Sequence, residues 1–451
     1  MLGNELMGGK VRNIGRQIFQ VRRASRLAVI VSGALLVGAT MIAPSIVSAS
    51  TYGQAPTLQI RGRSGSPGDP CTTHPGSEPC LPDQTPGDGE PHPGHSPSEV
   101  CVGNQDDRLD DGRKCVASLT EALKLDADKG TIILKQSISY QTPRINKSVT
   151  IRAQDSRASI DSDSNACLEV RAGAAARTTV VLEDFDIATC VTVNNAYLTL
   201  TNMTVAARDG LKPAIEVVAG DLTFLSSFLK GSGKQGIGLQ IDERGSATIN
   251  INKTKRNVRI FGFDTGIAVS GSLALQSGLV TDNSTGVKLS LAGENPHGGS
   301  GSAQIGGAVT IAKNGTGVIV EADSNGNVSI EKARFIANST GIELRATSPG
   351  AGFEEPAYNV ANSDFSSEPI DLRIVAPGPN RLDFPATGNT KNGRAIDNDR
   401  NPLSCDLGGK PTGALKEICR KPGYRSYGLQ TSVPEPKISD DLLALPTLDA
   451  N

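Results

Sequence analysis

The chain has 451 residues, of which 50 are glycine and 4% are aromatic, and it contains no tryptophan. A compact globular core normally holds more aromatic bulk, whereas stacked short strands can be filled with Val, Ile, Leu and Ala. Residues 1–49 hold six of the 45 basic and one of the 47 acidic side chains, so the remainder has a net charge of about −7. An acidic chain without aromatic–basic clusters argues against nucleic-acid binding.

The first 49 residues are typical of a secretory signal peptide. A basic region from Lys10 to Arg26 precedes an apolar segment from Leu27 to Ala43, and the small residues Val47–Ala49 form a processing site. An uncleaved anchor is the alternative, because the apolar segment is close to the minimum length of a membrane span. In both cases the rest of the chain crosses a membrane. We therefore expect a secreted, extracellular or cell-surface protein, with no membrane contact unless this segment stays as an anchor.

Residues 50–100 predict a disordered linker. They contain ten of the 26 prolines, many Gly, Ser and Asp residues, and few large apolar side chains. Such a segment cannot bury enough apolar surface to offset the chain entropy lost on folding. We expect four regions: a signal peptide or anchor (1–49), the linker (50–100), a β-helix with its N-terminal cap (101–390), and a C-terminal cap loop and tail (391–451).

A short helix is expected at the N-terminal end of the folded region. The segment from Cys115 to Leu125 has helical spacing, and Ser118 and Glu121 are spaced for a capping interaction. The first strand follows at Gly130–Leu134. The helix therefore caps the β structure that comes after it.

One turn sequence then recurs four times. Each copy has a polar turn residue, then Thr-Gly, then a strand with alternating apolar positions. Asn and Gly tolerate the left-handed backbone conformations that sharp corners require. The four copies begin at Asp264, Asn283, Asn314 and Asn338.

The repeat has a period of 20–31 residues. An apolar-x-apolar triplet recurs with its first apolar residue at positions 168, 191, 215, 237, 267, 287, 318, 342 and 370. Variable length confined to loops is typical of a solenoid. The Leu-x-x-Leu-x-Leu pattern of leucine-rich repeats is missing, and the amphipathic helices that a βαβ sheet needs between its strands are absent. A β-sandwich would need antiparallel hairpins with two-residue turns, which the constant turn sequence does not indicate. We therefore predict an all-β chain: a right-handed, single-stranded parallel β-helix of about nine coils.

The eight cysteines fit an oxidising compartment and suggest four local disulfides. Cys167 and Cys190 both lie one place before the first inward residue of a coil, in the position that Gly236, Gly266, Gly286, Gly317 and Gly341 occupy elsewhere. Neighbouring parallel strands lie about 4.8 Å apart, within reach of a disulfide, so this pair is expected to join adjacent coils. The suggested pairs are Cys71–Cys80, Cys101–Cys115, Cys167–Cys190 and Cys405–Cys419.

The Asn-x-Thr-Gly turns and the entry segment from Cys115 through Gly130-Thr-Ile-Ile resemble the extracellular members of the pectin-lyase-like superfamily of right-handed parallel β-helix proteins. The resemblance covers about residues 101–400. It implies the fold but not the activity, because such a superfamily includes pectate lyases, polygalacturonases, phage tailspikes and non-catalytic surface proteins. Thr120 stands where the entry motif of some bacterial surface members has Arg.

No catalytic set of this superfamily is evident. The resemblance implies clustered Asp residues and a Gly-His-Gly-type turn for hydrolases, and Ca²⁺-binding acids with an Arg or Lys base for lyases, and neither pattern is found. We expect no metal site and no cofactor.

The repeat register offers one candidate surface patch. Residues that alternate with the apolar triplet place Glu343 and Arg345 on one coil, Asp371 and Arg373 on the next, and Glu321 on the coil before. Diagonal salt bridges that relieve like-charge stacking explain this pattern simply. A carbohydrate-contact or acid/base patch is the alternative, although an aromatic platform for sugars is mostly lacking.

These observations lead to two functional hypotheses. The first is a non-catalytic secreted or surface β-helix that acts in adhesion, envelope structure or contact with a polysaccharide or cell-surface glycan. The second is a polysaccharide lyase or glycoside hydrolase that acts on acidic polysaccharide with an unrecognised site.

Overall fold

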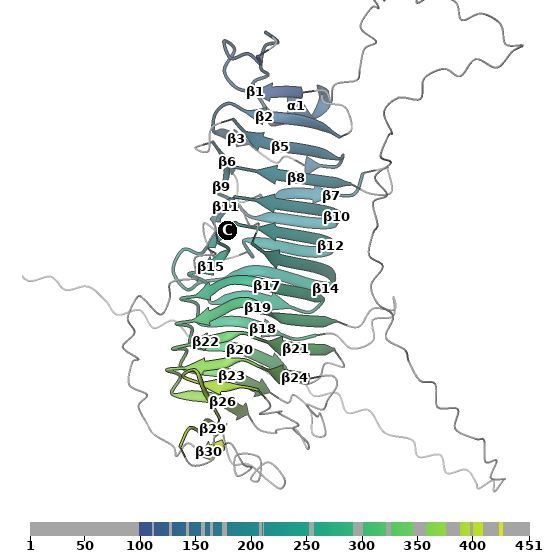
Figure 1. Cartoon of the computed structure of the whole chain (residues 1–451). Coiled ribbons are helices and arrows are strands. Elements are labelled where there is room, and N and C mark those ends of the chain that lie inside the picture. Colours follow the sequence, from purple (N-terminus) through teal and green to yellow (C-terminus); the bar gives the residue numbers. More distant parts are fainter. Residues whose placement is uncertain are drawn as a thin grey trace, which may run out of the picture. The chain divides into compact units, whose positions relative to one another are not determined.

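The computed structural model describes residues 99–408 and 424–426, with gaps at 111, 126–128, 141–143, 155–157, 163–165, 174–177, 207–209, 211, 252–256, 292–300, 322–325, 346–357, 376–387 and 397–399. The expected signal peptide and linker, with Cys71 and Cys80, lie outside these residues. Nearly all described pairings between strands are parallel, and each strand pairs with its counterpart one coil away. This arrangement confirms the predicted parallel β-helix (Figure 1).

Each coil contributes to three parallel sheets, which we call sheets I, II and III in the order in which the chain visits them. Sheet I contains β1 (Glu99–Val102), β2 (Gly130–Leu134), β5 (Val149–Ala153), β8 (Thr179–Glu183), the second halves of β10 (Val191–Thr201), β12 (Ile215–Leu225) and β14 (Ile237–Asn250), the first halves of β17 (Ser272–Thr281) and β19 (Ser302–Ala312), β21 (Asn327–Glu331) and β24 (Tyr358–Ala361).

Sheet II follows the next corner of each coil. It contains β3 (Ile138–Tyr140), β6 (Ser159–Ser162), β9 (Asp186–Ile187), β11 (Thr204–Ala206), β13 (Phe228–Lys230), β15 (Arg259–Phe261), the second halves of β17 and β19, β22 (Arg334–Ile336), β25 (Asp364–Ser366) and β27 (Thr390–Lys391). The short β28 (Arg394–Ala395) pairs antiparallel with β27.

Sheet III carries the triplet repeat that the sequence reveals. It contains β4 (Arg144–Ile145), β7 (Leu168–Arg171), the first halves of β10, β12 and β14, β16 (Thr265–Val269), β18 (Thr285–Leu289), β20 (Thr316–Glu321), β23 (Thr340–Arg345), β26 (Ile370–Val375), β29 (Leu403–Gly408) and β30 (Tyr424–Ser426). This sheet therefore continues beyond residue 390.

The core consists of columns of inward side chains that stack from coil to coil. In sheet III one column is formed by residues each at most 1% exposed: Leu168, Val191, Ile215, Leu239, Ile267, Val287, Val318, Ile342, Leu372 and Cys405. In sheet II the rings of Phe335 and Phe365 stack with their centroids 4.9 Å apart. Burial of these apolar columns supplies the main stabilisation of the stack.

The register differs from the sequence prediction in two coils. The first inward residues of the triplets are Leu239 and Leu372, which pair with Ile215 and Ile342, and not Ile237 and Ile370. Both segments have three alternating apolar residues, so two registers fit the pattern. A shift by two residues keeps every apolar side chain on the inner face, and the hydrophobic pattern cannot distinguish the two.

Two predicted disulfides are confirmed. Cys167 and Cys190 join adjacent coils at a Cα–Cα distance of 4.4 Å, and Cys101 and Cys115 are joined at 4.6 Å. Cys167 and Cys190 share the position before the first inward residue of a coil. In other coils this position is occupied by Gly266, Gly286, Gly317 and Gly341, and by Gly238 in place of the expected Gly236. Cys405 is also disulfide-bonded. Its expected partner, Cys419, lies outside the described residues.

The helix α1 (Leu119–Leu125) lies beside β1 at the N-terminal end of the stack (Figure 1). Its backbone Glu121 N–H donates to Ser118 Oγ at 3.2 Å, as the capping spacing predicts. Leu119 and Ala122 are buried and belong to the same core as the first coils.

The repeated asparagines have a role that the sequence analysis missed. The left-handed residue at each of these corners is the one before the asparagine: Asp282, Lys313 and Ala337 have φ values of 57°, 54° and 55°. The asparagine side chains instead point into the core and are at most 2% exposed. They form a buried ladder from coil to coil, which we call the asparagine ladder: Asn283, Asn314 and Asn338.

Candidate functional site

Four of the five residues predicted to form a surface patch lie together on the outer face of sheet III. Glu343 pairs with Arg373 on the next strand, and Glu321 pairs with Arg345. Arg345 Nε lies 2.5 Å from Glu343 Oε1, Arg373 Nη1 lies 3.8 Å from Glu343 Oε2, and Arg373 Nε lies 3.0 Å from Asp406 Oδ2. The patch is therefore an ion-pair network across β20, β23, β26 and β29.

Asp371, the fifth predicted member, does not belong to this patch. The two-residue register shift places it one coil beyond Gly341, where its side chain is buried and its residue is 1% exposed. Asp371 Oδ2 accepts hydrogen bonds from Lys391 Nζ at 2.6 Å and from the backbone N–H of Ser404 at 2.5 Å. The prediction that Asp371 stands on an exposed face is wrong, because the alternation pattern fits both registers.

The carboxylates of the network are poor candidates for acid/base chemistry. Partial burial raises the pKa of Glu321, but hydrogen bonds from Ser290 and Lys288 and the charges of Lys288 and Arg345 outweigh it, so the net pKa lies below its usual value. Lys288 Nζ lies 3.0 Å from Glu321 Oε1. Glu343 is 4% exposed and held by two guanidinium groups. Glu321 and Glu343 are therefore each held by neighbouring cations on the outer face of sheet III.

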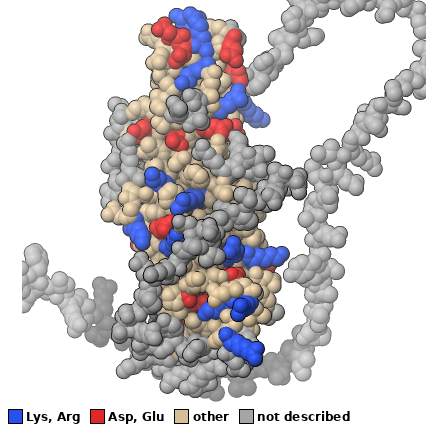
Figure 2. All heavy atoms as spheres, turned by 60° about the vertical axis from the view of Figure 1, so that its left-hand side comes forward, with Lys and Arg blue, Asp and Glu red and all other residues tan. Residues whose placement is uncertain are grey.

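The outer faces of the other two sheets differ in accessibility. On sheet II the outward side chains of the middle coils are covered, since Thr281, Ala312 and Ile336 are each at most 1% exposed. On sheet I none of the outward residues of the column from Thr131 to Asn359 is buried. Acidic and basic side chains are interspersed on the face that Figure 2 shows, so no single sign of charge dominates there.

The outer face of sheet I carries a long array of hydroxyl and amide side chains, which we call the polar face. One column consists of Thr131, Thr150, Val181, Thr199, Thr223, Thr248, Ala274, Gln304, Ser329 and Asn359. A second column consists of Thr179, Tyr197, Asp221, Ser246, Ser272, Ser302 and Asn327. Because parallel strands are spaced at about 4.8 Å, the members other than Val181 and Ala274 form a regular array of hydrogen-bond donors and acceptors.

Tyr197 gives the polar face an aromatic side chain. Among the described residues, Leu125 and Tyr197 are the exposed large hydrophobic side chains, at 63% and 38%. Tyr197 stands between Thr179 and Asp221 on the neighbouring strands. The sequence analysis did not identify this aromatic residue, because only the register of the strands shows which face of the sheet a tyrosine occupies.

A cleft of about 480 Å³ hollows the N-terminal end of the polar face, and we call it the N-terminal cleft. Arg152 Nη2 on β5 lies 3.4 Å from Glu99 Oε1 on β1, across the intervening β2. Asn202 Nδ2 donates to Asp184 Oδ1 at 2.5 Å at the corner where sheet I ends. Four carboxylates and two cations line the cleft: Glu99, Asp110, Glu183, Asp184, Lys135 and Arg152.

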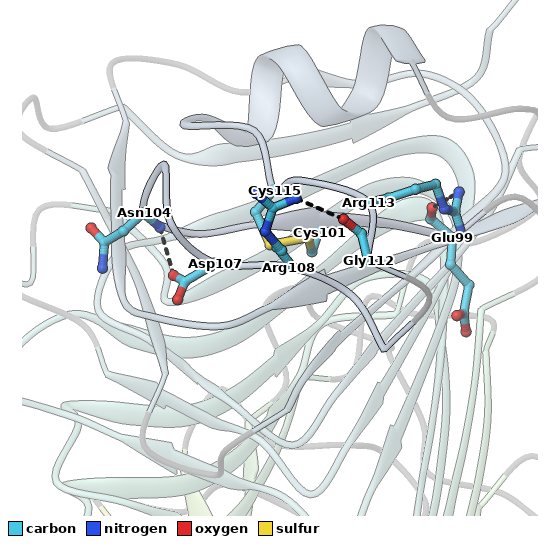
Figure 3. The surroundings of a disulfide bond; sticks show 8 residues. All are labelled: Glu99, Cys101, Asn104, Asp107, Arg108, Gly112, Arg113 and Cys115. Atoms are coloured by element: carbon cyan, nitrogen blue, oxygen red, sulfur yellow. Dashed lines mark hydrogen bonds between the residues drawn. A yellow bond between two sulfur atoms is a disulfide. The ribbon is translucent and has the colours of Figure 1, made fainter.

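One wall of this cleft is the loop closed by the Cys101–Cys115 disulfide (Figure 3). Leu109 packs with both cysteines and with Ile133 of β2. The loop is held by its own hydrogen bonds, including Asn104 N–H to Asp107 Oδ2 at 2.7 Å, and Arg113 Nη1 donates to the carbonyl oxygen of Glu99 at 2.8 Å. The disulfide thus fixes Asp110 beside the outer face of the first strands.

A second cleft, of about 350 Å³, lies near the other end of the polar face. Its lining includes Gln276, Gln304, Glu331 and Lys332. Gly307 has a φ of 77° at a break in the register between β17 and β19, a conformation that favours glycine. The polar face therefore has concave sites at two distant coils.

Other classes of site are not indicated within the described residues. They contain no group of three or more His, Cys, Asp or Glu side chains placed to hold a metal ion. In the same part of the chain, no helix has the length and apolar character needed to span a membrane.

Comparisons with known proteins give little further information. No protein-family model matches the chain, and no curated protein matches it in sequence. Among solved structures, the A-module of the mannuronan C-5 epimerase AlgE4 from Azotobacter vinelandii matches with 13% identity, covering 65% of this chain and 88% of that chain at a TM-score of 0.32. The function of the polar face must therefore be inferred from its own residues.

Proposed function

We propose that this protein is a secreted or surface-attached, non-catalytic β-helix that binds glycan along its polar face. The observation that carries the proposal is the accessible array of hydroxyl and amide side chains on sheet I, from Thr131 to Asn359. Such groups can exchange hydrogen bonds with the hydroxyls of a sugar chain, and a regular array suits a polymer. The Cys101–Cys115 and Cys167–Cys190 disulfides are consistent with an oxidising compartment.

Two further features support glycan contact at this face. Tyr197, at 38% exposure, offers an aromatic ring that can lie against the apolar face of a sugar. The N-terminal cleft combines carboxylates with Lys135 and Arg152, so it can both accept and donate hydrogen bonds. Adhesion to a glycan-bearing surface, or a structural role in an envelope, would use the same contacts.

The non-catalytic part of the proposal is supported by the state of the acids. The carboxylates of the predicted patch are paired with Arg345, Arg373 and Lys288, and Asp371 is buried beside Lys391. A general acid needs a raised pKa and access to substrate, and none of these groups has both.

Binding to insoluble neutral and acidic polysaccharides, followed by titration with soluble oligosaccharides, tests the proposal. Tyr197→Ala should weaken binding by about tenfold, the effect of losing one stacked ring. Leu125→Ala is the control, because it removes the other exposed large apolar side chain of the described residues, which lies on α1 away from the polar face. Equal effects of the two substitutions, or no binding to any polysaccharide tested, would contradict the proposal.

A second assay addresses catalysis. The full-length protein is incubated with acidic polysaccharides, and the formation of unsaturated or reducing ends is measured. We expect none. Release that disappears in Glu343→Gln would overturn the non-catalytic assignment and support a lyase or hydrolase.

A further inference from the structure

The asparagine ladder follows one hydrogen-bonding rule at each step. The side-chain amide of Asn283 donates to Asn314 Oδ1 at 3.1 Å and to the carbonyl oxygen of Ile260 at 3.3 Å. Asn314 repeats this pattern with Asn338 Oδ1 at 3.0 Å and the carbonyl oxygen of Val280 at 3.1 Å. Each rung therefore needs an oxygen that accepts from the preceding rung and a second atom that donates.

Glu368 occupies the fourth rung. It precedes Asp371 by three residues, as Asn338 precedes Gly341, and Asn338 Nδ2 donates to Glu368 Oε1 at 3.2 Å. The Oε1 atom thus does what Asn Oδ1 does on the earlier rungs. The Oε2 atom takes the place of the amide nitrogen, yet an ionised carboxylate can only accept hydrogen bonds.

Two buried oxygen atoms near the end of the ladder are left without hydrogen-bond partners. They are Glu368 Oε2 and Asp371 Oδ1, and their residues are 5% and 1% exposed. Such orphan atoms are rare and costly in folded proteins. A proton on Glu368 turns Oε2 from an acceptor without a partner into a donor.

We propose that Glu368 is protonated and neutral in the folded protein, where it closes the asparagine ladder as a hydrogen-bond donor and makes the C-terminal coils sensitive to pH. The protonated Oε2 atom can donate to one of two acceptors: a main-chain carbonyl oxygen, as on the earlier rungs, or Asp371 Oδ1. In either case the proton on Glu368 removes the repulsion that two ionised carboxylates, those of Glu368 and Asp371, would have.

The charges around Glu368 are consistent with this state. Asp371 on β26 is compensated by Lys391 on β27 at 2.6 Å and by the backbone N–H of Ser404 on β29, so this cation pairs with Asp371 and not with Glu368. Asn338, from the preceding coil, is uncharged. Burial raises the pKa of Glu368 well above its usual 4.5, the charge of Asp371 raises it further, and the hydrogen bonds of Asn338 act in the opposite direction.

The sign of the pH effect follows from linkage. A carboxyl whose pKa is higher in the folded than in the unfolded state gives stability that is complete at low pH. That stability falls as the pH rises above about 4.5, the usual pKa, and the fall continues until the raised pKa of the folded state is reached. Over this range the folding equilibrium constant decreases by up to tenfold per pH unit. The C-terminal coils should therefore loosen as the medium becomes alkaline.

Hydrogen-exchange protection factors of the full-length protein test this effect. In the wild type, the protection of amides in β23 and β26 should fall between pH 5 and pH 8 by tenfold or more. In Glu368→Gln this fall should be much smaller, because the glutamine amide donates at every pH and the dependence that remains is that of Asp371, whose pKa is also raised by burial. Glu343→Gln is the matched control, since Glu343 lies in the ion-pair network on the outer face, and it should keep the wild-type pH dependence.

Infrared spectroscopy with ¹³C-labelled glutamate gives an independent test on the wild type. A protonated glutamic acid band at pH 7 that is missing from Glu368→Gln is the expected result. A wild-type spectrum without that band, or the same pH dependence in wild type and Glu368→Gln, would overturn the proposal. The wild-type spectrum decides alone if the glutamine variant does not fold.

Discussion

A single asparagine of the ladder satisfies several buried polar groups at once. The side-chain oxygen of Asn314 accepts from both the backbone N–H and the side-chain amide of Asn283, and its own amide donates to Asn338 Oδ1 and to the carbonyl oxygen of Val280. Each group left without a partner in a buried position costs about 1–3 kcal/mol. The ladder therefore stabilises the corner between sheets II and III more than one side chain usually does.

Asn314→Ala should lower the free energy of unfolding by about 3 kcal/mol, because it leaves donors of Asn283 unpaired in the core. Denaturation by urea, followed by circular dichroism, measures the change. Asn327→Ala is the control, since Asn327 is exposed on the polar face, and surface substitutions cost less than about 0.5 kcal/mol. A similar loss in both variants would show that the ladder adds nothing special.

At the scale of elements, the two described disulfides constrain different structures. Cys167–Cys190 joins equivalent positions immediately before β7 and β10, in adjacent coils. Cys101–Cys115 closes the loop that forms a wall of the N-terminal cleft. One bond therefore acts on the stack of coils and the other on the binding surface.

The paired variants Cys167→Ser/Cys190→Ser and Cys101→Ser/Cys115→Ser should separate these roles. Loss of the first bond opens a constraint between residues 23 apart and should cost roughly 3 kcal/mol of stability, with glycan binding retained. Loss of the second bond should weaken glycan binding, and it should lower the melting temperature less than loss of the first bond does. Calorimetry and polysaccharide binding of both variants provide the check. A reversed pattern would contradict the assignment.

The elements also show what the sequence could and could not predict. The period of the triplet predicts the parallel β-helix, and the shared position of Cys167 and Cys190 predicts their disulfide. The place of Asp371 was not predictable, because Ile370-x-Leu372-x-Ile374 fits two registers that differ by two residues. The polar face was missed because its strands vary in sequence, and their outward positions become visible only when the pairing is known.

At the scale of the whole described region, each coil is held by its two neighbours. The pairings along sheets I, II and III connect a strand with the equivalent strands one coil before and after, and the core columns run through all coils. Stability in such a stack is approximately a sum of terms between neighbours. The end coils have a neighbour on one side only.

Hydrogen exchange should therefore be slowest in the middle of the stack. We expect amides of β12 and β14 to be protected most, with protection falling toward β26 and β29, because local opening starts where a coil has fewest neighbours. Mass spectrometry of the full-length chain after timed labelling measures this gradient. Equal exchange rates in all three sheets from end to end would show that the stack opens as one cooperative unit.

The burial of the asparagine ladder has a practical consequence for producing the protein. Asn283, Asn314 and Asn338 each begin an Asn-x-Thr sequence, an acceptor of N-linked glycosylation in eukaryotic secretory pathways. An oligosaccharide attached to the growing chain would occupy side chains that must enter the core, where they are at most 2% exposed. A host whose secretory pathway glycosylates asparagine would therefore yield misfolded material, whereas an oxidising bacterial periplasm offers the disulfides without the sugars.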